Sequence, residues 1–248
     1  MKTLSDELLT VLVPCRNEEQ SVAETVAGIL AERSRIPLRL EILLIDDGSA
    51  DGTRRKMEEI CREHPECRMQ VNERNVGVGR AVLDAYRVID PRSWVTVVPG
   101  DNEIIFASIH RYLAVREEYD IILGYLQNAV IRTIVRRLAS QAFTTAVSLL
   151  YGFSFRYLNG MKMYRVAAFQ GIEVSSGGHA FNAELLAKAV LRDPALRIGE
   201  VPFIARGRAR GASKAFRPGS VLRAVREVVV GARSVARYRR EIIERQVP

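Results

Sequence analysis

The sequence predicts an α/β protein whose mostly parallel central sheet is covered by helices on both faces. Short apolar runs rich in β-branched residues recur along the first half of the chain, and helical periodicity follows most of them. Strands that alternate with helices in this way pair in parallel, because each crossover helix returns the chain to the same end of the sheet. Hydrophobic residues make up 48% and charged residues 27% of the 248 residues, a composition that supports an ordinary globular core.

The predicted strands and helices alternate up to about residue 124. Turn signals bound the apolar runs, and the apolar residues of the intervening stretches recur at three- and four-residue spacing. The predicted strands are residues 9–13, 40–45, 69–71, 94–98 and 121–123. The predicted helices are residues 21–32, 53–63, 78–89 and 105–117.

Beyond residue 124 the alternation gives way to a mainly helical half. A long helix is expected at residues 132–151, then a glycine-containing segment at 159–178, a helix at 181–191 and a strand at 197–204. We expect this half to form a lid or acceptor region at the edge of the sheet, without a second core. The sequence therefore predicts one domain, residues 1–215, and a basic amphipathic helical tail, residues 216–248.

The tail combines an apolar stripe with many arginines. Between residues 220 and 245, aliphatic side chains recur at helical spacing and arginines lie between them. Such a helix either packs on its own domain with a solvated basic face or lies on an anionic membrane surface. The two arrangements are compatible with each other.

Charge, cysteine content and the first residues restrict the partners and the cellular compartment that we expect for the protein. The formal net charge of +8 favours anionic partners of several classes. Three cysteines, an odd number without metal-ligand spacing, indicate a reducing compartment. The first residues lack the basic start and apolar run of a signal peptide, and no stretch reaches the roughly 18 apolar residues that cross a bilayer. These features predict a cytoplasmic protein.

Two adjacent carboxylates, Asp46 and Asp47, follow directly on the predicted strand at residues 40–45. Ligands of open α/β sheets bind beyond the carboxyl ends of the strands, so both side chains are suitably placed to hydrogen-bond a base and a ribose. Two neighbouring carboxylates also repel each other unless something binds there. Asp51 and Thr53 are more typical of a turn that caps the next helix.

A family resemblance appears in two segments. Residues 13–19 read Val-Pro-Cys-Arg-Asn-Glu-Glu, and residues 46–53 read Asp-Asp-Gly-Ser-Ala-Asp-Gly-Thr. Together they resemble family-two glycosyltransferases with the Rossmann-like A-type nucleotide-sugar fold, and within these the dolichyl-phosphate mannose synthase and polyprenyl-phosphate sugar transferase branch. The resemblance implies a nucleotide-sugar donor. The nucleotide contacts that it implies in these segments are Pro14, Arg16, Glu18, Asp46 and Asp47.

A glycine-containing loop at residues 73–81, Glu-Arg-Asn-Val-Gly-Val-Gly-Arg-Ala, is similar to the branch's Arg-Asn-x-Gly-x-Gly-x-Ala loop. Glycine allows close backbone approach, and the helix that follows is expected to direct its N-terminus at the phosphates. The resemblance assigns nucleotide binding to Asn75, Gly77, Gly79 and Arg80.

The fourth predicted strand ends in the sequence Val-Pro-Gly-Asp-Asn-Glu at residues 98–103, where the family usually has Asp-x-Asp-x-Gln or a variant. Pro99 replaces the first aspartate, Asp101 matches the second, and Glu103 stands at the glutamine. One or two carboxylates, with phosphate oxygens and water, suffice for Mg²⁺. The resemblance therefore implies Mg²⁺ or Mn²⁺ held by Asp101 and Glu103, with Asp101 also serving catalysis.

A basic segment at residues 208–214, Arg-Ala-Arg-Gly-Ala-Ser-Lys, is similar to the branch's Arg-x-x-Gly-x-Ser-Lys. In the branch this segment closes over the donor phosphates. We therefore expect Arg208, Ser213 and Lys214 to neutralise charge on the departing nucleoside diphosphate, with Arg208 and Lys214 contributing to catalysis. Looser matches lie at residues 159–164, which resemble the family's Ser-Gly-Phe-Lys segment, and at 181–185, which resemble a helix with an acceptor-side carboxylate.

The acceptor decides whether the reaction needs a general base. A lipid phosphate is ionised near neutral pH, because its second pKa is about 6, and it needs cations to position it. The branch holds this phosphate with arginines near the fifth strand, which here implies Arg132, Arg136 and Arg137, although its usual Gly-Ser-Arg is Gly-Tyr-Leu at residues 124–126. A saccharide hydroxyl would instead need Glu184 or His179 as base.

The sequence thus predicts an inverting, metal-dependent glycosyltransferase. It would move a sugar from a UDP- or GDP-linked donor to polyprenyl phosphate at the cytoplasmic membrane face, with peripheral attachment through the tail. Transfer to a saccharide and a non-catalytic nucleotide- or nucleic-acid-binding module are the alternatives. We do not expect a nucleic-acid partner, because aromatic residues are only 7% and are not clustered among basic ones. Pairing of two copies through the tail is compatible with the sequence.

Overall fold

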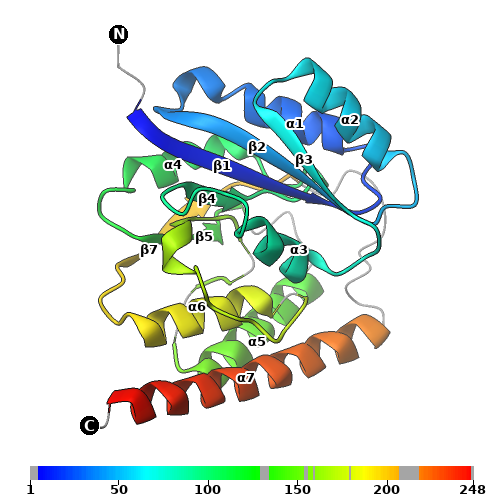
Figure 1. Ribbon diagram of the computed structural model, residues 1–248. Coiled ribbons are helices and arrows are strands. Elements are labelled where there is room, and N and C mark those ends of the chain that lie inside the picture. Colours follow the sequence, from blue (N-terminus) through cyan, green and yellow to red (C-terminus); the bar gives the residue numbers. More distant parts are fainter. Residues whose placement is uncertain are drawn as a thin grey trace.

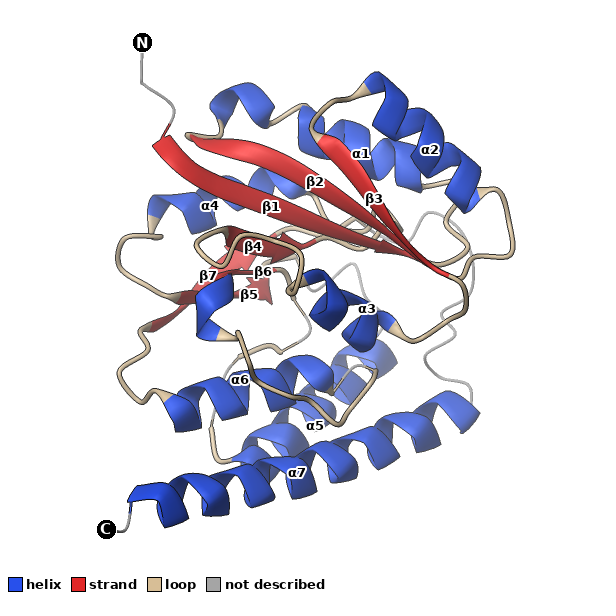
Figure 2. Cartoon of the chain, in the orientation of Figure 1, coloured by secondary structure: helices blue, strands red, loops and turns tan. Residues whose placement is uncertain are grey.

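A computed structural model describes residues 5–128, 134–153, 156–158, 160–178, 180–206 and 218–246. Figures 1 and 2 show a twisted sheet between helices, with one long helix running along the outside. The strands are β1 (Ser5–Cys15), β2 (Leu38–Asp47), β3 (Cys67–Asn72), β4 (Trp94–Val97), β5 (Ile121–Leu126), β6 (Lys162–Arg165) and β7 (Ile198–Phe203). The α-helices are α1 (Val22–Leu30), α2 (Thr53–Glu63), α3 (Val78–Ala85), α4 (Ile109–Ala114), α5 (Ile134–Tyr151), α6 (Phe181–Arg192) and α7 (Pro218–Gln246). Short 3₁₀ helices are η1 (Arg33–Arg35), η2 (Phe106–Ser108) and η4 (Val166–Ala168).

The seven strands form one sheet in the order β3-β2-β1-β4-β6-β5-β7. Parallel pairs join β1 to β2 and β4, β2 to β3, and β5 to β7, whereas β6 is antiparallel to both of its neighbours. The predicted fold class, a mostly parallel α/β sheet with a C-terminal helix, is confirmed. The expectation that residues 159–178 lie at the sheet's edge is wrong for β6, which lies inside the sheet. This strand has only four residues, with a charged one at each end, so it lacks an apolar run.

Two clusters of buried side chains lie on the two faces of the sheet. Val11 and Val13 of β1 belong to one cluster, together with residues of α1, α2 and α4. Leu12, between them, belongs to the other, together with residues of α3, α5 and α6. Successive side chains of a strand point to opposite faces, so β1 is buried on both sides, as expected for a central parallel strand.

Several predicted helices are present with shifted ends. The helix expected at 78–89 ends at Ala85, and the one expected at 105–117 is divided into η2 and α4. Beyond Ala85 the chain continues with tighter bonds, from Arg87 N–H to the Asp84 carbonyl and from Val88 N–H to the Ala85 carbonyl. Such i→i−3 bonds are common where a helix ends, and apolar periodicity alone does not reveal them.

The long helix α7 packs along α5 and α6, and Val228 and Val235 on this contact are buried. Other apolar side chains of α7 remain exposed, including Val225 at 56% and Ile243 at 54%. Among the side chains of α7 that the structure describes, the exposed arginines are Arg226, Arg233, Arg237, Arg239 and Arg240. Of the two arrangements that the sequence allows, packing on the domain is observed, and it leaves basic and apolar side chains on the outside. Among the helices that the structure describes, none is both long enough and apolar enough to cross a membrane.

Candidate active site

The carboxyl ends of β1, β2 and β4 meet around the buried side chain of Cys15. Cys15 lies opposite Asp46 in the parallel ladder, and Gly100, just beyond β4, packs so closely on the Cys15 sulfur that no side chain fits there. Burial raises the pKa of the Cys15 thiol, and the charges of Glu18, Asp46 and Asp101 raise it further. Four carboxylates, these three and Asp51, therefore lie near Cys15 at the edge of the sheet where ligands of α/β proteins bind.

The loop after β1 is tied to the turn after β2 by hydrogen bonds. Asn17 has a φ of 58°; its Oδ1 accepts the Ala50 N–H at 2.9 Å, and its own N–H donates to Ser49 Oγ at 3.0 Å. The Glu18 N–H donates to Thr53 Oγ1 at 2.8 Å. These bonds hold the two loops of the family motif side by side.

The predicted nucleotide contacts in the first loop differ in exposure. Pro14 is buried, Arg16 is exposed, and Glu18 is half-buried. One oxygen of Glu18 accepts the Ser21 hydroxyl at 2.8 Å, next to the start of α1. The structure therefore places all three at the carboxyl edge, with Arg16 on the solvent side.

Asp51 and Thr53 have the structural role that the sequence predicts. Asp51 Oδ1 accepts the Thr53 N–H at 3.0 Å and the Thr53 hydroxyl at 2.5 Å. Burial raises the pKa of Asp51, but the bonds from Thr53 outweigh this and leave it below the usual carboxyl value. Both residues shape the turn that begins α2.

Asp47 organises the loop between β3 and α3. Its Oδ1 accepts the Val76 N–H at 2.8 Å and the Asn72 amide at 3.1 Å, and its Oδ2 accepts the Gly77 N–H at 2.9 Å. The backbone of this loop also packs so tightly on Gly48, whose φ is 66°, that a Cβ would stand 2.6 Å from the backbone. Both oxygens of Asp47 are thus occupied by the protein.

Asp46 keeps more of its hydrogen-bonding capacity. It is 2% exposed, and its Oδ1 accepts the Ser49 N–H at 3.0 Å. Within the described part of the chain, Oδ2 makes no hydrogen bond. Of the two adjacent aspartates, Asp46 is therefore the one with an acceptor atom left for a ligand.

The N-terminus of α3 is partly covered by another loop. The Gly77 N–H donates to Asn75 Oδ1 at 3.0 Å as well as to Asp47. The φ of Gly77 is 88°, a conformation that favours glycine. The Gly79 N–H donates to the Gly177 carbonyl at 3.2 Å. Arg80 is exposed, and its Nε lies 2.9 Å from a carboxylate of Asp84. The backbone N–H groups of Gly77 and Gly79, which the sequence predicts to bind phosphate, are thus hydrogen-bonded to protein groups.

Asp101 is the first residue of a short segment that is hydrogen-bonded to the residues just after β7. Asp101 Oδ1 accepts the Glu103 N–H at 3.1 Å. The Arg206 N–H donates to the Glu103 carbonyl at 2.7 Å, and the Arg206 guanidinium donates to Asn102 Oδ1 at 2.8 Å. An isolated bridge pairs Ile104 with Ala205. Arg206, two positions before the basic segment 208–214, thus contacts the residues that directly follow Asp101.

Arg206 and Asn102 were not expected as site residues. For Asn102, the sequence does contain a signal, the Gly-Asp-Asn turn at residues 100–102, because asparagine tolerates the positive φ of 55° that Asn102 adopts. Asn102 also donates from Nδ2 to Glu24 at 2.8 Å, which fixes the turn on α1. The pairing with Arg206 has no local signal, because these residues are far apart in the sequence.

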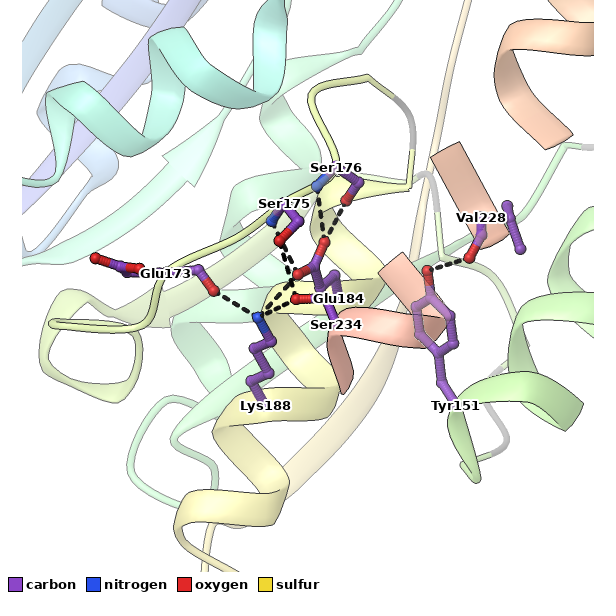
Figure 3. Close-up of polar contacts among 8 residues, drawn as sticks. All are labelled: Tyr151, Glu173, Ser175, Ser176, Glu184, Lys188, Val228 and Ser234. Carbon is purple, nitrogen blue, oxygen red and sulfur yellow. Dashed lines mark hydrogen bonds and ion pairs between the residues drawn. The ribbon is translucent and has the colours of Figure 1, made fainter. Parts of the chain in front are cut away.

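Glu184 is buried between α6, α7 and the loop before α6 (Figure 3). Its side chain is fully buried and accepts the N–H groups of Ser175 and Ser176 at 2.9 Å each and the Ser176 hydroxyl at 2.7 Å. Lys188 Nζ lies 2.8 Å from Glu184 Oε1 and bonds Ser234 Oγ of α7 at 2.8 Å.

This environment suits a structural ion pair better than a general base. Burial raises the pKa of Glu184, but the bonds from Lys188, Ser175 and Ser176 outweigh it, and the pKa lies below the usual value. A general base must have a lone pair directed at the proton that it takes, with a pKa near the working pH. The lone pairs of Glu184 are directed at Lys188 and the two serines.

The remaining predicted residues lie wholly or partly outside the described structure. Arg136 and Arg137 belong to α5, but their side chains are not described. The predicted residues outside the described part of the chain are Arg132, His179, Arg208, Ser213 and Lys214.

The carboxyl edge fits a divalent ion that arrives with a diphosphate. Within the described residues, no three or more His, Cys, Asp or Glu side chains gather closely enough to hold a metal by themselves. Mg²⁺ in such proteins keeps several waters and binds through one or two carboxylates and substrate phosphates. Asp101 is half-buried and, like Asp46, lies near Cys15, so it is suitably placed for that role, with Glu103 two residues away.

A family model, Glycosyl transferase family 2, matches residues 10–174, which is more than half of the chain. This chain is a family 2 glycosyltransferase. The matched region runs from β1 to the loop before α6 and includes the aspartates at the ends of β2 and beyond β4. The family and the enzyme class that the motifs predict are therefore confirmed.

Curated relatives of this family 2 glycosyltransferase belong to the predicted branch. Dodecaprenyl-phosphate galacturonate synthase of Rhizobium johnstonii is 27% identical over 210 residues, which cover 83% of this chain and 61% of the relative. Dolichol-phosphate mannosyltransferase of Saccharomyces cerevisiae is 25% identical over 219 residues, which cover 83% of this chain and 80% of the relative. This chain thus spans about three fifths of the first relative and four fifths of the second.

Solved structures of a Mycobacterium tuberculosis enzyme share the fold of this glycosyltransferase. Glucosyl-3-phosphoglycerate synthase in complex with Mg²⁺ and UDP superposes with a TM-score of 0.67 at 16% identity, covering 92% of this chain and 79% of that one. The complex with Mn²⁺, UDP and glucosyl-3-phosphoglycerate gives a TM-score of 0.64 at 17% identity, covering 92% and 80%. Identities this low establish the fold alone.

Proposed function

We propose that this glycosyltransferase is metal-dependent and inverting, and that it transfers a sugar from a UDP- or GDP-linked donor to a polyprenyl phosphate at the cytoplasmic membrane face. The observation that carries the proposal is the convergence of Asp46, Asp101 and Glu18 around Cys15 at the carboxyl edge of the sheet. The names of the curated relatives support the acceptor class, and the nucleotide and metal in the solved structures support the donor.

The donor's nucleoside is assigned to the edge between β1, β2 and β3. Asp46 has a free acceptor oxygen there, while Asp47 holds the loop that carries Asn75 and Gly77 in place. Arg16 and Arg80 are exposed at the rim, where a charged donor is met first. Pro14, Glu18 and Gly79 complete the walls that the family motif implies.

The donor's diphosphate is assigned to the edge beyond β4. Asp101, with Glu103, would hold Mg²⁺ or Mn²⁺, which neutralises charge on the leaving diphosphate when it is bound. Arg206 is anchored beside Asp101 through Asn102 and Glu103. We infer that Arg208, Ser213 and Lys214, which follow Arg206 closely in sequence, act on the same diphosphate.

The acceptor oxygen would attack the anomeric carbon opposite the diphosphate, which inverts that centre. A polyprenyl phosphate is ionised near neutral pH, since its second pKa is about 6, so the reaction requires no general base. The environment of Glu184 agrees with this, because its oxygens are engaged by Lys188 and the backbone. Arg132, Arg136 and Arg137 are proposed to position the acceptor phosphate.

Membrane attachment is proposed for the outer side of α5 and α7. Exposed apolar side chains on these packed helices accompany the exposed arginines of α7, a combination that binds anionic lipid surfaces. Among the described side chains of these two helices, the large exposed apolar ones are Leu138, Leu149, Leu150, Val225, Val229 and Ile243. On this proposal, residues 1–215 form the catalytic domain and residues 216–248 form the attachment helix.

The test is transfer by the purified protein to a polyprenyl phosphate in vesicles that contain anionic lipid. A panel of UDP- and GDP-sugars is supplied with Mg²⁺ or with Mn²⁺, and the lipid fraction is analysed for sugar. We expect one donor to give a lipid-linked sugar and to lose activity when the metal is chelated. Absence of a lipid product with every donor would overturn the acceptor, and activity that survives chelation would overturn the metal.

A further inference from the structure

Lys162 is the first residue of β6, and the direction of this strand brings it to the carboxyl edge of the sheet. It pairs with Leu123 of β5, and the next residue, Met163, pairs with Thr96 of β4. Because β6 is antiparallel to both neighbours, its N-terminal end lies where β4 and β5 have their carboxyl ends. Lys162 is therefore on the same edge of the sheet as Asp101, on the β5 side of β4.

The side chain of Lys162 belongs to the face of the sheet that α5 covers. Met163 belongs to the cluster on the α1 face, whereas Tyr164 and Leu123 belong to the cluster that includes Val147 of α5. Alternation along the strand puts Lys162 on the same side as Tyr164. This helix is also the one whose first turns contain Arg136 and Arg137 in the sequence.

Lys162 makes no ion pair within the described part of the chain. Its Nζ donates to the Gly160 carbonyl at 2.9 Å. Burial lowers the pKa of Lys162 to about 7, and burial is the sole cause. Lys162 is half-buried, and removing a charge from water without an ion-pair partner costs stability, so such residues are candidates for a site where a charge is needed during function.

Few titratable groups surround Lys162. The strand β4 has none, β5 has Tyr125, and β6 has Tyr164 and Arg165. Burial raises the pKa of Tyr164, so it carries no charge near neutral pH. Across the sheet on β7, Glu200 pairs with Leu123 and accepts the Arg156 N–H at 2.8 Å, so it lies two strands from Lys162.

On α5, burial raises the pKa of Tyr151, which is therefore also neutral near pH 7. The side chains of Arg136 and Arg137 on that helix are not described, and both are cations. No described group therefore competes with an incoming anion for Lys162.

We propose that Lys162 is a binding residue for the phosphate of the acceptor lipid, an inference that rests on the proposed function. The donor diphosphate is assigned to Asp101 and the β1–β4 edge, whereas Lys162 lies on the β5 side and faces α5. A cation here would contact the acceptor phosphate from the sheet, and it would add to the arginines that are proposed above to position the same phosphate. The ammonium also stabilises the negative oxygen until it bonds to the sugar.

Proton uptake accompanies this binding. Near pH 8 most of the empty protein holds Lys162 as the neutral amine, because its pKa is about 7. A phosphate dianion beside it favours the ammonium, so the amine takes a proton from water when the acceptor binds. Affinity is therefore greatest between about pH 6, below which the phosphate is protonated, and about pH 7, and it falls as the pH rises further, by at most about tenfold per pH unit.

The experiment compares the wild type with Lys162→Met and Lys162→Arg. Steady-state transfer to polyprenyl phosphate gives the acceptor KM, and titration calorimetry gives the affinities for the donor and for a water-soluble short-chain isoprenyl phosphate. We expect Lys162→Met to weaken acceptor binding about 10- to 100-fold, the effect of one charge-assisted hydrogen bond, and to leave donor affinity within about twofold. Circular dichroism and melting establish that both variants fold.

Lys162→Arg provides the decisive readout, because arginine stays charged at every relevant pH. Calorimetry at pH 8 in two buffers of different ionisation enthalpy is expected to detect uptake of about one proton by the wild type and none by Lys162→Arg. Lys56→Met is the control, since Lys56 is paired with Glu59 on α2 at 3.0 Å, on the other face of the sheet. It is expected to behave as the wild type does.

The outcomes separate this inference from the proposed function. Isoprenyl phosphate binding with proton uptake, without transfer to lipid, overturns the proposed function and keeps Lys162 as a phosphate site. Transfer to lipid with an unchanged acceptor KM in Lys162→Met overturns the role of Lys162 alone. Weakened donor binding in Lys162→Met, or a turnover that rises with pH in the wild type and not in Lys162→Met, overturns it as well. Absence of isoprenyl phosphate binding by the wild type overturns both.

Discussion

The carboxyl edge of the sheet and the contact between α6 and α7 each contain a buried carboxylate, and the two differ in what is left for a ligand. Asp46 is 2% exposed and accepts one backbone N–H, from Ser49. Glu184 is 0% exposed and accepts from Ser175, Ser176 and Lys188. Burial is therefore a poor guide to a ligand site in this protein. The number of unused acceptor positions distinguishes the two regions.

The largest effect is expected at the α6–α7 contact. Glu184→Gln removes the charge that balances Lys188, and breaking a buried ion pair in this way lowers the free energy of unfolding by about 3–5 kcal/mol. Urea denaturation followed by circular dichroism measures the change. Glu59→Gln, which removes an exposed pair with Lys56, is the matched control and should leave stability unchanged.

The pH dependence of stability checks the same pair. The pKa of Glu184 is below the usual 4.5, so its contribution is present above pH 4.5 and is lost as the pH falls through the lowered pKa. The difference in stability between the wild type and Glu184→Gln should therefore shrink in acid. Turnover per folded molecule should be the same in both proteins near pH 7. A stable variant with turnover lowered more than a hundredfold would contradict the structural role and favour Glu184 as a base.

The second largest effect is expected at the sheet edge. Asp101→Asn keeps the size and the Oδ1 acceptor for Glu103 N–H but removes the charge proposed to hold the metal. We expect kcat to fall by about 10²–10³, the usual loss when one group that stabilises developing charge is removed. Steady-state kinetics at several Mn²⁺ concentrations measures it. Asp90→Asn, at an exposed pair with Arg92, is the control, and equal kinetics in both variants would exclude Asp101 from the metal site.

The sequence predicts the sheet edge better than the helix contact, for physical reasons. The strand that ends at Asp47 contains four consecutive apolar residues, 42–45, directly before its two carboxylates, so both the strand and the carboxylates are visible locally. The Glu184–Lys188 pair is also visible as an i,i+4 pair. Its burial is not, because it depends on Ser175 and on Ser234 of α7, which only tertiary packing brings there. β6 is hidden for a similar reason, since its four residues become a strand only between β4 and β5.

A smaller effect separates the two adjacent aspartates. Asp47→Asn places an amide N–H₂ against either the Val76 or the Gly77 N–H, because both oxygens of Asp47 accept backbone donors. One unsatisfied buried donor costs about 1–3 kcal/mol of stability. Asp46→Asn can keep its oxygen on the Ser49 N–H, so it should melt as the wild type does.

Donor affinity completes the comparison of Asp46 and Asp47. We expect Asp46→Asn to weaken binding of the nucleoside diphosphate about tenfold or more, the loss of one hydrogen bond to a charged group. Calorimetric titration with UDP and with GDP measures it for each variant. If Asp46→Asn destabilised the protein and Asp47→Asn did not, the assignment of structural and ligand-binding roles would be reversed.

The smallest effect is expected from Ser234→Ala on α7. Lys188 keeps Glu184 at 2.8 Å and the Glu173 carbonyl at 2.7 Å when the Ser234 hydroxyl is removed, so Lys188 loses one neutral partner. The exposed hydrogen bond between the hydroxyls of Ser234 and Ser175, at 3.0 Å, is lost with it. We expect a loss of about 0.5–1.5 kcal/mol, seen as a fall in Tm of a few degrees. A loss as large as that of Glu184→Gln would mean that the hydroxyl, and not the charge pair, holds α7 on α6. Because Val228 and Val235 are buried on the same contact, the apolar packing of α7 should survive this substitution.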